Sequence, residues 1–153
     1  MRHKVTIVGL VLVLALSSLS FKCDGNSSDP VRKSARAADT IAGSITEMIK
    51  VKRQLAQQQK IAPDEELALT NALLKANTAD KAFVDAIKKI KGTPAPSDKS
   101  NLATLFSAVS AAVNDIDAGV LGVKNPDSKS KLTTILNTIK ASLGIISSFV
   151  QSA

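Results

Sequence analysis

The residue types that most often carry acid–base and metal chemistry are nearly missing from this sequence. It contains one histidine, His3, and one cysteine, Cys23. His3 lies in a segment that we expect to be removed, and the remaining chain then lacks the usual general base and metal ligand. This excludes Ser-His-Asp and Cys-His arrangements, histidine-ligated zinc and Glu-x-x-His di-iron sites. We therefore expect no enzyme activity, no metal site and no cofactor.

Asp80 is the one polar residue near the centre of a predicted core stripe, between Leu73 and Phe83. A buried carboxylate has to be paired, hydrogen-bonded or protonated, and such groups often mark functional sites. The alternative is that Asp80 reaches the edge of the stripe, or bonds a neighbouring hydroxyl or lysine, and helps to set the register of the helices. The second interpretation is the one we expect.

A repeat identifies two of the helices that would position such groups. Residues 99–123 recur as residues 129–153, thirty positions later. In each copy the large apolar residues step by four and three, which is the spacing of one face of an α-helix. Neither helix can bury its stripe alone, so the two must face each other or a third partner. The stripes are Leu102, Phe106, Val109, Val113, Ile116 and Val120, then Leu132, Leu136, Ile139, Leu143, Ile146 and Val150.

Two earlier segments follow the same pattern. Asp29 suits the N-cap of the first helix and Pro30 its first position, and Pro63 opens the second helix. The acidic residues 64–66 suit a helix start because of the helix dipole. The predicted stripe of the first helix is Ala35, Ala38, Ala42, Ile45, Ile49 and Ala56, flanked by Ile41, Met48 and Leu55.

The sequence therefore predicts an all-α fold, an antiparallel up-down-up-down four-helix bundle over residues 29–153. The helices are expected at about 30–60, 63–91, 98–122 and 128–151, with a signal segment in front.

Composition agrees with helices and excludes some partners. There is no Trp or Tyr and there are four Phe, which argues against platforms for sugars or single-stranded nucleic acid. The net charge is +7, and removal of residues 1–20 leaves 18 basic and 13 acidic groups, or +5. This modest excess does not indicate nucleic-acid binding.

Residues 1–20 have the features of an export signal. A positive start at Arg2 and Lys4 precedes an apolar run over residues 5–16 and then a serine-rich stretch. The alternative is an uncleaved membrane anchor over residues 5–21. Either way we expect an exported protein that is periplasmic, envelope-associated or extracellular.

Residues 21–28 are expected to form a flexible leader that contains Cys23. In position, this cysteine resembles the lipid-attachment site of a bacterial lipobox, although Phe21 and Lys22 stand where that motif has small residues. The alternatives for Cys23 are a free thiol and a disulfide with another molecule, since the chain has no second cysteine.

The basic residues form a further candidate site. A hairpin about Ala62 would bring basic residues of the first two helices together at the end next to the leader. Such a patch would favour an anionic membrane surface or envelope polymer. The alternative is that these charges complement helix ends and aid solubility. The patch comprises Arg32, Lys33, Arg36, Lys88, Lys89, Lys91 and Lys99.

The predicted function is that of an exported, non-catalytic bundle with a structural or interaction role. The alternative is a carrier that holds an apolar ligand or lipid between its helices. Self-association is a further expectation, through Leu67 and Leu74 or through Ile145 and Phe149.

Overall fold

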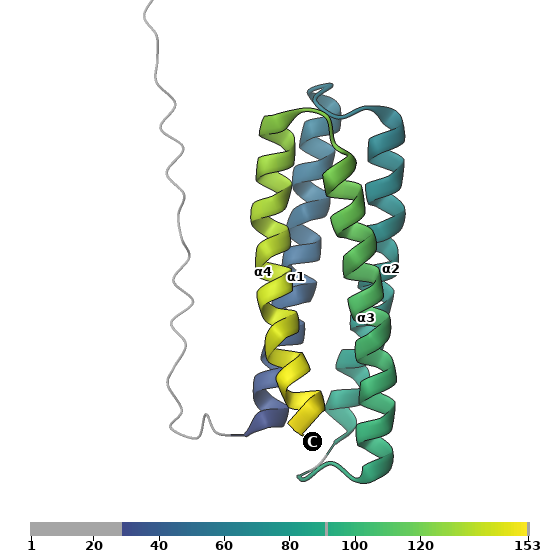
Figure 1. Cartoon of the computed structure of the whole chain (residues 1–153), viewed down its shortest axis with the longest axis vertical. Coiled ribbons are helices and arrows are strands. Elements are labelled where there is room, and N and C mark those ends of the chain that lie inside the picture. Colours follow the sequence, from purple (N-terminus) through teal and green to yellow (C-terminus); the bar gives the residue numbers. More distant parts are fainter. Residues whose placement is uncertain (1–28, 91, 153) are drawn as a thin grey trace, which may run out of the picture.

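The computed structural model describes residues 29–90 and 92–152, and the regular secondary structure in these ranges is helical. The helices lie side by side as a bundle (Figure 1). This confirms the predicted all-α four-helix bundle. The predicted signal and leader, residues 1–28, lie outside the described residues. The helices are α1 (Pro30–Gln57), α2 (Pro63–Lys89), α3 (Pro96–Gly122) and α4 (Pro126–Ser152).

All four helices begin at a proline, which fits the first helical position because its missing N–H needs no partner there. The third and fourth helices therefore begin two residues before the predicted starts, at Pro96 and Pro126. Asp29 caps α1 as expected, because its Oδ1 accepts a hydrogen bond of 3.0 Å from the Val31 N–H. α4 is capped by Asn125, whose Oδ1 accepts a hydrogen bond from the Ser128 N–H at 3.0 Å, although Asp127 and Ser128 are equally suitable caps by residue type.

The first two helices end earlier than predicted. α1 ends at Gln57, and Gln59 then takes a left-handed φ of 55°. α2 ends at Lys89, and Gly92 follows with a φ of 83°, which glycine adopts without strain. Each turn reverses the chain within a few residues.

The helices form a ring in which each one contacts two neighbours. α1 packs most extensively against α4, and α2 against α3. The α1–α2 and α3–α4 connections, residues 58–62 and 123–125, lie together at one end, which we call the two-loop end (Figure 1). The α2–α3 connection lies at the opposite end, where α1 begins, which we call the leader end.

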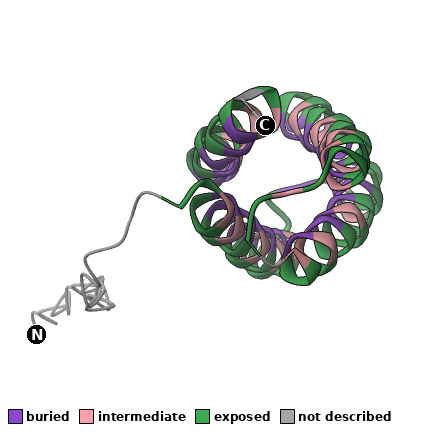
Figure 2. Cartoon of the chain, turned by 90° about the horizontal axis from the view of Figure 1, so that it is seen from below, coloured by how far each residue is buried: buried purple, intermediate pink, exposed green. Residues whose placement is uncertain are grey.

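The buried faces of the helices point into the ring, as Figure 2 shows from below. In α3 and α4, buried residues recur thirty positions apart, as the repeat predicts: Leu102 and Leu132, Val109 and Ile139, Ile116 and Ile146.

The buried stripe of α1 differs from the prediction. Ala35, Ala42 and Ile49 are only half-buried, whereas Ile41 and Met48 are fully buried. The larger side chains of α1 face the core because their burial removes more apolar surface from water than burial of alanines does. The buried residues of α1 are Ser34, Ala37, Ala38, Ile41, Ser44, Ile45, Met48, Lys52 and Leu55.

Glycines inside the helices provide a test of this packing. We expect Gly43→Ala and Gly144→Ala each to raise the free energy of unfolding by about 0.5–1 kcal/mol, because alanine favours the helix. A Cβ at either position meets nothing within 4 Å. Gly119→Ala is the control, since its Cβ would lie 3.0 Å from Leu69 Cδ2 and should gain less. Urea unfolding followed by circular dichroism measures all three, and equal gains would contradict the close α2–α3 approach.

Candidate functional site

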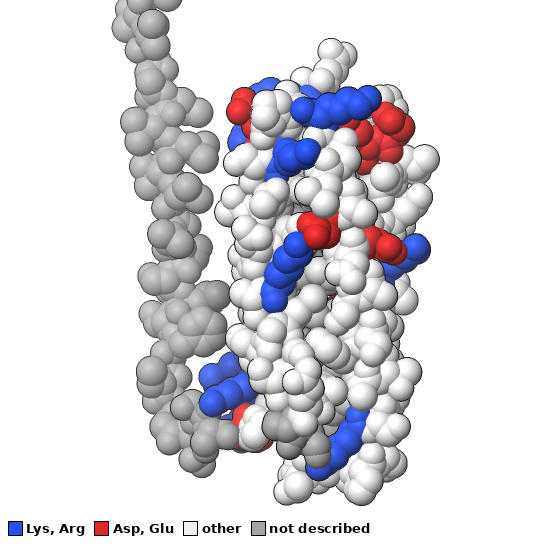
Figure 3. Space-filling model, viewed as in Figure 1, with Lys and Arg blue, Asp and Glu red and all other residues white. Residues whose placement is uncertain are grey.

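The described members of the predicted basic patch lie together at the leader end. Arg32, Lys33 and Arg36 occupy the first two turns of α1, Lys88 and Lys89 the last turn of α2, and Lys99 the first turn of α3. Lys99 is half-buried and the other five are exposed. The space-filling view shows basic side chains at this end on both sides of the molecule (Figure 3). Lys91 lies outside the described residues.

Acidic groups at the leader end offset only part of this charge. Arg32 Nε lies 3.6 Å from Asp29 Oδ2, and both side chains are largely exposed, so the pair contributes little. The Asp98 carboxylate accepts a hydrogen bond of 3.0 Å from the Ala95 N–H, which satisfies the start of α3. An excess of positive charge therefore remains where α1 begins.

An open pocket of about 490 Å³ lies beside this patch. Its walls are mostly apolar, and Asp29 and Lys99 supply its two charged groups. An amphiphile with an anionic head would suit such a lining better than a fully polar ligand would. The lining residues are Asp29, Pro30, Val31, Gly92, Thr93, Pro94, Lys99 and Phe149.

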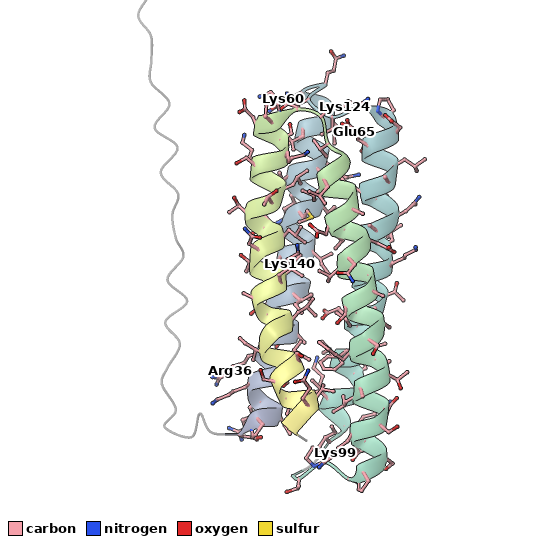
Figure 4. The ribbon with its side chains drawn as sticks, viewed as in Figure 1. Arg36, Lys60, Glu65, Lys99, Lys124 and Lys140 are labelled. Atoms are coloured by element: carbon pink, nitrogen blue, oxygen red, sulfur yellow. The ribbon has the colours of Figure 1, made fainter. Side chains whose placement is uncertain are left out.

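At the two-loop end, one carboxylate joins both connections. Glu65 is 8% exposed, and its Oε2 accepts from the Ala62 N–H at 3.0 Å. Its Oε1 accepts from the Lys124 N–H, in the other connection, at 3.1 Å. Ser128 adds a second link, because its Oγ donates to the Lys60 carbonyl at 3.2 Å. Figure 4 labels Lys60, Glu65 and Lys124 close together at this end. The acidic start of α2 thus has a structural role.

A buried lysine, Lys52, lies about one helical turn from these connections, toward the middle of the bundle. Its burial was not predicted from the sequence. Lys52 Nζ is 3.0 Å from Glu66 Oε1 and 2.7 Å from Thr70 Oγ1. The lysine side chain is 7% exposed, against 38% for that of Glu66. Its signal was the seven-residue spacing from Ala38 through Ile45, which continues to Lys52. The charge is matched, so this cluster also stabilises the α1–α2 contact.

Removal of the Glu65 carboxylate tests its role. Glu65→Ala should lower the free energy of unfolding by about 2–4 kcal/mol, because two part-buried backbone N–H groups lose a charged acceptor. Thermal and urea unfolding measure the loss. Asp64→Ala, next to it and exposed, is the control and should change stability much less. Equal losses in the two variants would show that helix-start charge, not the link between the connections, is what matters.

Asp80 is the exception among the polar groups. It is 2% exposed, and its Oδ1 has no hydrogen-bond partner in the described part of the chain. Burial raises the pKa of the Asp80 carboxyl from 3.8 to about 7, and the nearby charge of Asp39 adds to this increase. The expectation that Asp80 reaches the stripe's edge, or bonds a hydroxyl or lysine, is therefore wrong for this oxygen.

The neighbouring helices explain why this carboxyl lacks a cation. Lys75 Nζ of α2 lies 3.0 Å from Asp115 Oδ2 of α3, so these two residues are at the same height along the bundle. One to two turns from that pair Asp80 meets the part of α3 within residues 100–114, which has no charged side chain. From α1 the interacting charge is Asp39, which has the same sign. Protonation is therefore the means by which Asp80 tolerates burial.

The sign of the pH effect follows from this raised pKa. Between pH 3.8 and about 7 the unfolded chain ionises Asp80 while the folded chain keeps its proton. The Asp80 contribution to the free energy of unfolding therefore falls as pH rises, by at most about 1.4 kcal/mol per pH unit.

Asp80→Asn should remove this dependence, since asparagine is neutral at every pH. Urea unfolding should show the variant similar to the natural chain at pH 4 and more stable at pH 8, by about 1–3 kcal/mol. Asp85→Asn, exposed on the same helix, is the control. A constant difference between variant and natural chain across this range would refute the assignment.

No group of three or more His, Cys, Asp or Glu side chains in the described ranges could hold a metal ion. Asp115 and Asp117, two residues apart, lie on different faces of α3. Asp115 pairs with Lys75 of α2, and Asp117 pairs with Lys140 of α4 at 2.8 Å. Both carboxylates thus contribute to contacts between helices.

The predicted apolar surface is present only in part. Leu67, Leu74 and Ile145 are exposed by 62%, 59% and 51%. The expectation that Phe149 takes part in self-association is wrong, because its side chain is 6% exposed and belongs to the core. The face was misassigned because Phe149 lies three residues beyond the buried Ile146, on the same side of α4.

By length and hydropathy, two helices of the described chain would be able to cross a membrane, Pro96–Gly122 and Pro126–Gln151. Core helices of bundles pass the same test, and these two supply much of the core here.

The fold and its polar groups thus define an all-helical bundle with a basic leader end and a buried carboxyl whose pKa is raised. In the comparisons with known proteins, no family model, no curated protein and no solved structure matches this chain.

Proposed function

We propose that this chain is an exported, non-catalytic helical bundle with a structural or interaction role, whose leader end faces an anionic membrane surface or envelope polymer. The proposal of export is based on the features of residues 1–20. The proposal of a non-catalytic role is based on the residues available, because no histidine follows His3. The positions of the three connections support the antiparallel up-down-up-down order of the helices.

The observation that carries the proposal is the collection of basic residues at one end. Three separate helix termini bring Arg32, Lys33, Arg36, Lys88, Lys89 and Lys99 to the end at which the chain enters α1. Each cation near an anionic lipid surface is worth up to about 1 kcal/mol. An attachment at residues 5–21 or at Cys23 would hold this same end against a membrane.

Vesicle co-sedimentation tests the proposal. The purified protein should bind vesicles that contain about a third phosphatidylglycerol, bind phosphatidylcholine vesicles weakly, and lose its binding as salt screens the charges. The double variant Lys33→Glu, Arg36→Glu should bind the anionic vesicles at least about thirtyfold more weakly, since two favourable charges become unfavourable ones.

The same helix supplies a matched control. Lys50 and Arg53 have the same spacing and are also exposed, but lie near the two-loop end of α1. Lys50→Glu, Arg53→Glu should leave binding nearly unchanged. An equal loss of binding in both double variants would show that only the net charge matters, not its position. Equal binding to neutral vesicles would show that the binding is not electrostatic. A soluble polyanion that displaces the vesicles would favour the envelope polymer.

A carrier of an apolar ligand is the second candidate. The pocket beside Phe149 favours it, since apolar walls and Lys99 suit one chain of an anionic lipid. Mass spectrometry of an organic extract from protein purified without detergent would show a stoichiometric lipid if this role is correct.

A further inference from the structure

A shallow apolar groove runs along the outer side of the α2–α3 contact, with a volume of about 710 Å³. Alanine and leucine side chains make most of its lining, and its charged members are Lys75 and Asp115, which pair with each other. Exposed apolar surface of this kind is a candidate for contact with a partner. The lining residues are Leu74, Lys75, Thr78, Ala79, Ala82, Leu105, Ala108, Ala111, Ala112 and Asp115.

The charge distribution identifies the partner that fits this groove. On the α3 side, residues 100–114 have no charged side chain, whereas the outer faces of α1 and the leader end have exposed cations. Two copies of a net-positive chain repel each other at those basic faces. Along the α2–α3 groove the uncharged wall of α3 can face the exposed Lys75 and Lys81 of α2, so fewer like charges oppose each other there.

The same surface has exposed leucine side chains, Leu67 and Leu74, that a groove of this kind could receive. Leu67 and Leu74 are seven residues apart on α2, so they share one face of the helix. Leu67 lies about 12 Å from Lys75 toward the two-loop end, at a rise of 1.5 Å per residue. Ala82 lies about 10 Å from Lys75 in the opposite direction, where it lines the groove.

We propose that a second copy of this chain docks on this groove about a two-fold axis that passes between Lys75 and Asp115. Such an axis sets Leu67 of each copy into the groove of the other at the level of Ala82 and Ala108. It also sets Lys75 of one copy near Asp115 of the other, so the charges are complementary. The interface is isologous and closes at two subunits. The alanines allow helices of the two copies to approach closely.

Sedimentation equilibrium of the purified protein tests this dimer, from about 5 to 500 µM, the range of weak interfaces. The natural chain should show a monomer–dimer equilibrium. Leu67→Lys and Ala108→Arg should each raise the dimer dissociation constant at least about tenfold, because each buries an unpaired charge in the interface. Both positions are exposed in the single chain, so folding should be unaffected.

Two matched controls separate the groove from general surface effects. Leu121 is 65% exposed on α3 outside the groove lining, and Ala141 is exposed on α4. Leu121→Lys and Ala141→Arg should leave the dissociation constant unchanged. A monomer throughout the range, or equal losses in variants and controls, would overturn the proposal. So would an apolar dye that binds the monomer and is lost in Ala108→Arg, since the groove would then hold a small ligand.

Salt distinguishes this inference from the proposed binding to an anionic surface. An apolar interface should persist or strengthen at about 0.5 M salt, where vesicle binding is screened. Dissociation of the dimer by salt, in parallel with loss of vesicle binding, would contradict the groove as its origin.

Discussion

The bundle depends on the requirement that four apolar stripes be covered at the same time. Each helix contacts only its two ring neighbours, and no diagonal pair of the described helices packs together. The centre is therefore filled by large side chains such as Phe83, Leu136 and Ile139, all nearly inaccessible to solvent. Loss of any one helix would expose the stripes of two others, so the four helices are stable only together.

Two buried polar groups show how differently such a core can hold a charge. Lys52 has oxygen partners for its ammonium group, because Glu66 Oε1 and Thr70 Oγ1 lie within 3.0 Å of its Nζ. Asp80 is buried, has a carboxylate neighbour, Asp39, and faces an uncharged stretch of α3, so the pKa of its carboxyl is raised to about 7. The first arrangement links α1 to α2, and the second makes the stability of the bundle depend on pH.

The sequence predicted the bundle because its repeat and its helical spacing are properties of single elements. Basic residues at the leader end were predictable too, since a hairpin about Ala62 pairs the start of α1 with the end of α2. The burial of Lys52 and Phe149 was not predictable in the same way, because it depends on the rotation of each helix against two neighbours. Nor was the capping by Asn125, since Asp127 and Ser128 are equally good caps by residue type. A rotation of about 100°, the angle between successive residues of a helix, changes which side chains are buried. Only the packing of the helices fixes that rotation.

The pairing of the first helix with the last has a consequence for synthesis. α1 makes its largest contact with α4, so the buried face at Ile41, Ile45 and Met48 cannot be fully covered until the C-terminal helix has left the ribosome. A nascent chain ending before Pro126 would expose this surface and depend on chaperones to avoid aggregation. Closure of the ring therefore has to wait for α4, and a polypeptide truncated before it should be an early substrate for cellular proteases.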